Sequence, residues 1–375
     1  MSKKKKTILT LITVAVLLAL LIFLEQNKAK YNMAVSTLQK GAILAIVAVS
    51  MNLLNGFTGL FSLGQAGFMA IGAYVTAILI VPTESVEGVY YISGMNDGLF
   101  AFKQALEALP DPVLIGIAII IGGLVAALFA ALIGIPVLRL KSDYLAIATL
   151  GFSEIIRALI NSSQMDTITN GSYGISKIPG FGSTWGTLLI PFGVAAVCIA
   201  FIVLLIRSSY GRAFKAIRED EVAAEAMGIN LFKHKQLAFV ISSFFAAVAG
   251  GLLAMYMNSI QADTFKIALT YDILLIVVIG GVGSVTGSVL GAFLITMAKE
   301  WWLRFFDEPQ FIGGWEVPLF KTGFRMVIFS ILLMVVVLFY RRGIMGTNEF
   351  SWDAIASWPK KIAAKFKRKK KTEVE

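Results

Sequence analysis

The chain has 375 residues, of which 57% are hydrophobic and 15% are charged. This apolar content exceeds the roughly 45–50% of a soluble domain and excludes an ordinary soluble protein. The net charge of +10 does not indicate nucleic-acid binding, because the basic residues cluster at the termini and beside apolar runs. In those places they set membrane topology and contact anionic lipid. The single cysteine, Cys198, excludes an intrachain disulfide, and the single histidine, His234, excludes a metal site built from several histidines.

Apolar runs long enough to cross a bilayer alternate with charged loops along the chain. A transmembrane helix needs about 20 mainly apolar residues to cross roughly 30 Å of hydrocarbon. On this criterion the predicted spans are residues 7–24, 41–61, 63–82, 113–138, 143–160, 188–206, 237–258 and 323–340. The first run follows four lysines and resembles a signal peptide, but no small-residue cleavage site follows it. We interpret it as a retained span, with a signal anchor as the alternative.

Residues 271–298 pose a topological problem. If they crossed the membrane once, the basic tail "KKIAAKFKRKKK" would lie outside, against the positive-inside rule. The turn "GGVGSVTG" (280–287) instead predicts a hairpin whose two halves both open to the outer face. Such irregular backbone is tolerated at membrane depth where protein or a wet cavity surrounds it. We therefore predict an all-α polytopic membrane protein with about eight transmembrane helices plus a Gly-broken re-entrant hairpin.

This topology divides the chain into three parts. We expect residues 1–6 to form a cytoplasmic N-terminus, 7–340 a transmembrane domain, and 341–375 a basic cytoplasmic tail. The acidic loop at 83–112 and the turn-rich loop at 161–187 are expected outside. Both chain termini are then cytoplasmic.

A strongly charged stretch, 207–236, separates two apolar spans. Its charge density excludes a position in hydrocarbon, so we expect a water-facing loop. Phe214 to Met227 are mostly good helix formers, and Gly228 provides a stop, which predicts one helix over 214–228. Its small apolar residues, flanked by acids, suit a cleft on another protein. A solvated connector between spans is the alternative that spacing alone leaves open.

Polar residues inside or beside the spans are candidates for a substrate path. Asn52, Asn55, Ser62 and Gln65 are costly to bury without partners. The glycines near them either allow close helix packing or break helices to line a path. Glu154 is also a candidate because ionisable residues at membrane depth are often functional. Its i, i+3 spacing from Arg157 equally predicts a structural ion pair.

No catalytic motif is present. The sequence lacks a G-x-x-x-x-G-K-[ST] phosphate loop, an H-E-x-x-H pair and a C-x-x-C pair, and it has no soluble stretch of enzyme size. We therefore expect a chain that is not an enzyme and that holds no metal or cofactor. If transport uses ATP, another polypeptide must bind and hydrolyse it.

Five segments together resemble the permease subunits of bacterial ABC importers for branched-chain amino acids, specifically their longer, M-type permease. They are "GFTGLFSLGQAGFMAIGAY", "LRLKSDYLAIATLGFSEIIR", "TNGSYGI", "YGRAFKAIREDEVAAEAMGIN" and "VVIGGVGSVTGSVLGAF". They occur in the order of that family and lie within about residues 40–293. The fourth segment, within the charged loop, is the most specific of the five.

The resemblance implies that 207–236 holds the cytoplasmic helix that couples the permease to its ATPase. The broader importer pattern is Glu-Ala-Ala, three residues, then Gly; this chain keeps Ala223, Ala224 and Gly228 but carries its acid at Glu221. The expected coupling residues are Arg212, Arg218, Glu221, Ala223, Ala224, Glu225 and Gly228. The resemblance implies that the chain lies in the bacterial inner membrane. Its implied partners are a second permease that forms a heterodimer, two ATP-binding subunits and an extracytoplasmic substrate-binding protein.

Three alternatives remain at this stage. Related ABC systems carry urea or short amides. A secondary transporter driven by protons or sodium would need a titrating acid at mid-membrane, for which Glu154 and Asp272 are the candidates. A membrane scaffold without transport is the third alternative.

Overall fold

The computed structural model describes residues 3–140, 142–181, 186–303, 311–312, 315–316, 327–331, 334 and 343–350, and this part of the chain is mostly helical. The helices are α1 Lys3–Gln26, α2 Asn32–Asn52, α3 Gln65–Ile80, α4 Thr83–Val89, α5 Asp97–Glu107, α6 Asp111–Val137, α7 Ser142–Ile160, α8 Asp166–Thr169, α9 Leu189–Arg207, α10 Ser209–Glu219, α11 Glu221–Ala226, α12 Leu231–Met257, α13 Ile267–Gly280 and α14 Val285–Glu300. A π-helical turn, Leu53–Phe57, extends α2. Two short antiparallel strands, β1 Phe311–Ile312 and β2 Trp315–Glu316, pair with Phe311 opposite Glu316.

Five of these helices are long and apolar enough to cross a membrane: α1, α2 with its π-helical turn, α6, α9 and α12. A sixth crossing results if α7 and its continuation Ser163–Thr169, bent by 61°, count as one span. The predicted span at 63–82 is a shorter helix, α3, because residues 58–64 are not helical. The predicted span at 323–340 lies mostly outside the described residues. The all-helical membrane fold is confirmed, with five or six full-length spans in the described part of the chain.

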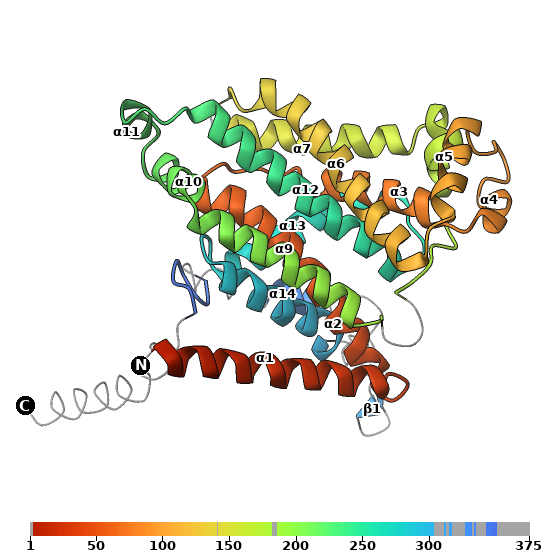
Figure 1. Ribbon diagram of the computed structural model, residues 1–375, viewed down its shortest axis with the longest axis horizontal. Helices are drawn as coiled ribbons and strands as arrows, with labels where there is room; N and C mark the ends of the chain where they lie inside the picture. The colour runs from red at the N-terminus through yellow and green to blue at the C-terminus, as the bar shows by residue number, and fades with distance from the viewer. Residues whose placement is uncertain are drawn as a thin grey trace, which may run out of the picture.

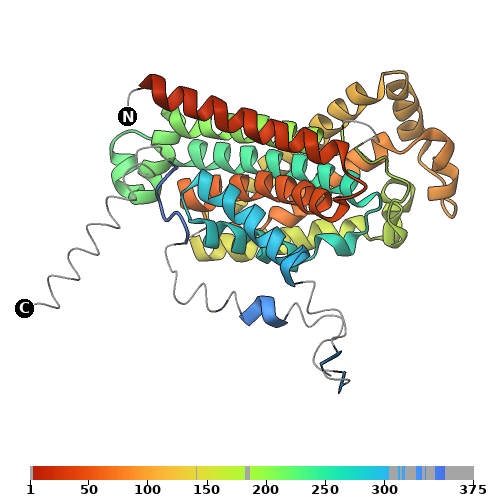
Figure 2. The same cartoon turned by 90° about the horizontal axis from the view of Figure 1, so that it is seen from below.

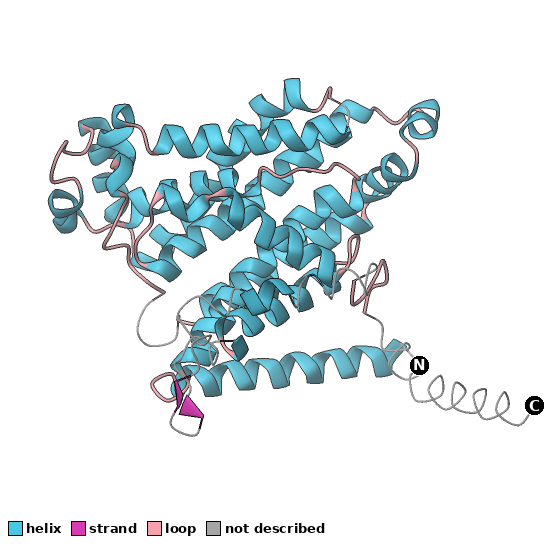
Figure 3. Ribbon diagram, turned by 180° about the vertical axis from the view of Figure 1, so that it is seen from behind, coloured by secondary structure: helices cyan, strands magenta, loops and turns pink. Residues whose placement is uncertain are grey.

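The ends of the helices gather at two opposite ends of the molecule (Figure 1). The start of α1 lies at the same end as α10 and α11, and α4 and α5 lie at the other. The views from below (Figure 2) and from behind (Figure 3) show the same separation. The first end carries the lysines that open the chain and the basic loop, whereas the region of α4 and α5 is rich in acids.

The central helices of the bundle are α2 and α12, whose span windows are 72% and 78% buried. Glycine lets α12 approach α3 closely, as the spacing of small residues predicts. A Cβ atom on Gly250 would lie 2.0 Å from the carbonyl oxygen of Met69, and one on Gly72 would lie 2.1 Å from that of Ala247. By contrast, the span window of α1 is only 6% buried. Near its end, the Glu25 carboxylate accepts hydrogen bonds from the backbone N–H groups of Thr187 and Leu188 at the start of α9.

The predicted Gly-broken hairpin is present as α13 and α14. At about 1.5 Å per residue, the 14 residues of α13 reach about 21 Å, which is short of the hydrocarbon thickness. The turn between the two helices uses Gly281 at φ +125° and Gly283 at φ +90°. A Cβ atom on Gly280 would lie 2.3 Å from the carbonyl oxygen of Gly287, so the two helices touch through glycine backbone.

Candidate coupling site

The charged loop folds into two helices, α10 and α11, so the prediction of a single helix over 214–228 is wrong. The break lies at Asp220, whose backbone is extended with φ −158° and ψ 112°. Its carboxylate accepts hydrogen bonds from the N–H groups of Val222 (2.8 Å) and Ala223 (3.0 Å) and so caps the start of α11. The high helix propensity of the whole stretch predicted a continuous helix and gave no indication of this cap. The signal in the sequence is an aspartate directly before Glu221 and the small residues.

Gly228 ends α11 in a left-handed conformation at φ +82°. The N–H of Gly228 donates to the carbonyl of Glu225 at 2.9 Å, and the N–H of Ile229 donates to that of Ala224 at 3.1 Å. These bonds satisfy carbonyls that the helix end leaves free. A Cβ atom at Gly228 would meet nothing within 4 Å, so only the backbone angle favours glycine here.

The outer face of α11 carries exposed apolar side chains. Ala224 is buried, whereas Val222 is 78% exposed and Met227 is 84% exposed. Ala223 and Glu225 are also exposed. An ion pair of 2.6 Å between Glu221 and Lys235 holds α11 to α12. The helix is therefore attached to the protein on one side and offers a small apolar surface with an acidic rim on the other.

Arg218 connects α10 to two interruptions of the membrane helices, the π-helical turn after α2 and the hairpin turn between α13 and α14. Its Nη1 atom donates a 2.7 Å hydrogen bond to the carbonyl oxygen of Gly56 in the π-helical turn. A Cβ atom on Gly283, in the hairpin turn, would lie 2.9 Å from the same nitrogen. The same helix is fixed to the protein by the buried side chains of Phe214 and Ile217. Arg212, by contrast, is exposed, and its side chain donates to the Ser209 hydroxyl at 3.0 Å.

Asn52 also joins the π-helical turn to the hairpin turn, from inside the protein. Its side chain is fully buried, and its Nδ2 atom donates to the carbonyl of Ser284 (2.9 Å) and the hydroxyl of Ser288 (2.7 Å). Its Oδ1 atom accepts from the N–H of Gly283 at 2.8 Å. The hydrogen-bonding groups of Asn52 are thus used to attach α2 to the hairpin turn.

The other predicted path residues lie nearby, in or beside the loop that precedes α3. Asn55 forms hydrogen bonds with the backbone N–H (3.1 Å) and carbonyl (3.4 Å) of Ser62 and so closes this loop. Gln65, the first residue of α3, donates from Nε2 to the Ser242 hydroxyl at 3.0 Å, and that hydroxyl donates to the Ser50 carbonyl at 2.7 Å. The Oε1 atom of Gln65 is buried and has no hydrogen-bond partner among the described residues.

Several buried hydroxyl residues in this region were missed by the sequence analysis. Thr149 accepts from the N–H of Leu63 at 3.0 Å, and Thr270 accepts from the N–H of Ala66 at 3.3 Å. Ser242 lies between Gln65 and α2. The available signal was a hydroxyl residue in an otherwise apolar run, which is too common in membrane helices to select these three.

Both acids that an ion-driven transporter would need are paired. Glu154 forms an ion pair of 2.8 Å with Arg157, as its spacing predicts. Asp272 forms one of 2.6 Å with Lys299. Near the C-terminal end of α7, Arg157 also approaches Asp263 at 3.5 Å. The pKa of the Asp263 carboxyl lies below its ordinary value, first because Lys266 donates a hydrogen bond to it and also because both cations are close.

The start of the predicted basic tail packs on the hairpin turn. The N–H groups of Ile344 and Met345 donate to the carbonyls of Ile279 (2.8 Å) and Gly280 (3.1 Å). The Glu349 carboxylate accepts from the N–H groups that begin α14. Of residues 341–375, the structure describes only 343–350, and this segment stabilises the hairpin turn beside Arg218.

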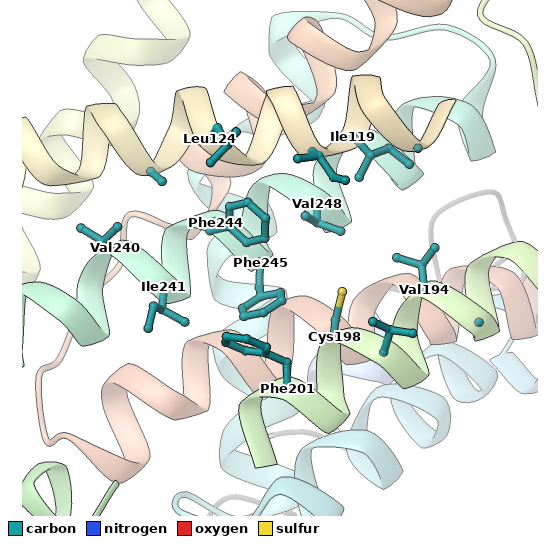
Figure 4. A pocket seen from close by; sticks show the side chains of 15 residues that line it. Ile119, Leu124, Val194, Cys198, Phe201, Val240, Ile241, Phe244, Phe245 and Val248 are labelled. Atoms are coloured by element: carbon teal, nitrogen blue, oxygen red, sulfur yellow. The ribbon is translucent and has the colours of Figure 1, made fainter. Parts of the chain in front are cut away.

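An apolar groove lies between α6, α9 and α12 (Figure 4). Its volume is about 730 Å³, and its lining side chains are apolar, with the rings of Phe201 and Phe245 5.5 Å apart. None of the predicted path residues lines it. In the part of the chain that the structure describes, no group of three His, Cys, Asp or Glu residues is placed to hold a metal ion.

A multi-pass helical domain with a broken-helix hairpin, in contact with a short charged helix, is an arrangement typical of membrane transport proteins. The family described as "Branched-chain amino acid transport system / permease component" matches residues 33–338, and the chain belongs to this family. It is therefore a multi-pass membrane permease, a type of subunit that is not itself catalytic.

Relatives support this assignment. The chain is 34% identical over 345 residues to the high-affinity branched-chain amino acid transport system permease protein LivM of Salmonella typhimurium, covering 83% of this chain and 72% of that protein. It is 35% identical to LivM of Escherichia coli strain K12 over 72% of this chain and 64% of that protein. It is 22% identical to the E. coli permease protein LivH over 82% of this chain and 93% of that protein. No solved structure matches.

Proposed function

We propose that this chain is the translocation subunit of an ATP-driven importer for branched-chain amino acids. The family and the names of its relatives support the substrate class. The observation that supports the mechanism is the contact of Arg218 with Gly56, beside Gly283. Through it, one charged helix outside the membrane reaches both breaks in the membrane helices.

The proposed mechanism is mechanical. A partner ATPase binds the exposed face of α11, around Val222 and Met227. When the ATPase pair closes on ATP, α11 moves, and the ion pair between Glu221 and Lys235 and the buried side chains of α10 carry the movement inward. Arg218 then displaces the π-helical turn and the hairpin turn together, because Asn52 ties these two turns to each other. Broken helices of this kind form the substrate sites of many transporters, around which the rest of the protein moves.

The partners and the sidedness follow from this proposal. A second permease subunit completes the translocation unit as a heterodimer, two ATPase subunits bind ATP, and an extracytoplasmic binding protein delivers the substrate. The end of the molecule with α10 and α11 faces the cytoplasm, together with residues 1–6 and 341–375. Its excess of basic residues agrees with the positive-inside rule.

The substrate path is proposed to pass the start of α3. Gln65 is the best of the five predicted residues, because its Oε1 atom is buried without a partner among the described residues. An acceptor of this kind suits the ammonium group of an amino acid, and the positive end of the α3 dipole suits its carboxylate. Asn52 and Glu154 are weaker candidates because both are already bonded within the protein.

Reconstituted transport tests the proposal. The full complex in vesicles is expected to take up leucine only with ATP, and uptake is expected to persist when ionophores collapse the proton and sodium gradients. Gly228→Pro and Ala224→Trp should abolish uptake and the binding protein's stimulation of the ATPase, while the subunits still copurify. Uptake that needs an ion gradient, or transport of urea in preference to leucine, would contradict the proposed mechanism or substrate respectively.

A further inference from the structure

A second groove lies between α9 and α14, at the end of the molecule that carries α10. Its volume is about 480 Å³. Its walls are apolar and include Ile199 and Val203 from α9 and Val289 and Leu290 from α14. Two cationic residues also line it: Arg207, the last residue of α9, and Lys215 of α10. The groove thus combines an apolar slot with a positively charged region.

The positive charge of this groove is not neutralised within the described part of the chain. Neither Arg207 nor Lys215 forms an ion pair with another described residue, and the Nζ atom of Lys215 lies 5.7 Å from the ring centroid of Phe57. One acid, Glu349, also lines the groove. Its oxygens accept from the N–H groups of Val285 (2.7 Å) and Thr286 (3.1 Å) and from the Thr286 hydroxyl (2.7 Å). This carboxylate is held by the start of α14, where a negative charge is favourable, and not by the two cations.

The helix faces beside the groove expose apolar side chains. On α9 the neighbouring Leu204 is 69% exposed, and on α14 Leu290 is 48% and Leu294 is 43% exposed. An apolar surface of this kind within a membrane span contacts acyl chains. The apolar groove of Figure 4 has similar walls but no charged residue in its lining, so it has nothing to select one lipid headgroup over another.

The positive charge of the second groove decides which kind of molecule can bind there. The basic tail of the chain itself, "KKIAAKFKRKKK", would be repelled by Arg207 and Lys215. A zwitterionic amino acid would find no free acid for its ammonium group. A phospholipid with a net negative headgroup satisfies both parts of the site, with its phosphate beside the two cations and an acyl chain between the helices.

We propose that this groove binds one anionic phospholipid from the membrane leaflet on the α10 side. The lipid phosphate contacts Arg207 and Lys215, and one acyl chain lies against Val203 and Val289. Because Lys215 belongs to α10 and Val289 to the hairpin, the bound lipid bridges the two elements that Arg218 also connects. Lipid binding itself does not depend on the transported substrate or on the partner ATPase.

Native mass spectrometry of the complex purified from membranes tests this site. Phosphatidylglycerol and phosphatidylcholine with identical acyl chains are titrated separately. We expect one phosphatidylglycerol to be retained at least tenfold more tightly than phosphatidylcholine. The double variant Arg207→Gln/Lys215→Gln should lose about thirtyfold in phosphatidylglycerol affinity, which is the contribution of two basic residues at a membrane surface. Arg139→Gln/Lys233→Gln removes the same charge from exposed positions outside the groove and should bind phosphatidylglycerol like the wild type.

A separate variant tests the acyl-chain slot. Val289→Trp keeps both cations and should weaken phosphatidylglycerol binding about tenfold, while glycerol phosphate, which has no acyl chain, should fail to compete with the lipid. Equal binding of both lipids, an equal loss in the control pair, or full competition by glycerol phosphate would each overturn the proposal. Thermal unfolding of each variant in detergent, expected to match the wild type, separates a lost site from a lost fold.

Discussion

The guanidinium of Arg218 donates a 2.7 Å hydrogen bond to the carbonyl oxygen of Gly56, and these two residues lie 162 positions apart in the sequence. The Gly56 carbonyl belongs to the π-helical turn, where the regular helix of α2 has ended. Irregular backbone near membrane depth needs a partner from elsewhere in the protein, because lipid provides none. The same arginine lies against Gly283 in the hairpin turn. One side chain of the charged loop thus contacts both irregular segments.

Replacement of Arg218 tests this connection. Arg218→Gln removes a charge-assisted bond worth roughly 1.5–3 kcal/mol when well shielded, and less here because the side chain is about one-third exposed. We expect leucine uptake to fall at least tenfold, while the ATPase subunits still copurify and hydrolyse ATP. Lys233→Gln, an exposed cation of the same loop, should retain normal uptake. Loss of ATPase copurification with Arg218→Gln would show that the residue acts in assembly instead.

Asn52 should contribute mainly to stability. Asn52→Leu keeps a similar volume but leaves the buried N–H of Gly283 without its acceptor, whereas the Ser284 carbonyl keeps the hydrogen bond from the N–H of Ser288. Each unsatisfied buried group costs about 1–3 kcal/mol, so we expect a clear fall in the midpoint of thermal unfolding in detergent. Asn55→Leu is the matched control because its bonds to Ser62 are longer and its side chain is only partly buried. If the midpoint of thermal unfolding fell equally in both variants, the bonds of Asn52 would contribute no more to stability than those of Asn55.

The sequence predicts much of this fold because length and polarity decide which segments enter the membrane. The hairpin also follows from its glycines, since only they permit the positive φ angles of Gly281 and Gly283. The shorter α3 was missed, because the run at 63–82 is mostly apolar and its overall polarity does not show where a helix begins. The break at Asp220 was missed because a single capping side chain outweighs the helix propensity of its neighbours.

The candidate site was less predictable than the fold. Polarity marks Asn52 as a residue that needs partners, but the partners lie about 230 positions away in the hairpin turn. No local pattern encodes such a contact. For the same reason, Arg218 was predicted as one of several coupling residues without its distinguishing bond to Gly56. The position of the Gln65 side chain depends on its hydrogen bond to Ser242, which lies 177 positions away in the sequence.

Gly228 offers a clean test of the C-terminal end of α11. A Cβ atom would meet nothing there, so Gly228→Ala should act only through the positive φ angle, at about 1–2 kcal/mol. We expect faster amide hydrogen exchange in residues 221–228 and a partial loss of ATPase stimulation. Gly228→Asn is the control, since asparagine tolerates the left-handed region and should preserve most protection. If alanine and asparagine behaved alike, the backbone angle would not be the reason for glycine.

Helices α4 and α5 should respond to acid through Glu107. Burial lowers the pKa of the Lys103 ammonium, and hydrogen bonds from Thr83 lower the pKa of the Glu107 carboxyl below its ordinary value of 4.5. A carboxyl with a lowered pKa stabilises the folded state above its unfolded pKa, and this contribution is lost as the pH falls below 4.5 through the folded pKa. Amide hydrogen exchange, corrected for its intrinsic pH dependence, should therefore show α5 opening more readily in acid. Glu107→Gln should remove this pH dependence and leave α5 less protected at neutral pH. Unchanged protection of α5 across this range in the wild type would contradict the prediction, because the hydrogen bonds from Thr83 to the carboxylate are the contacts that protonation weakens.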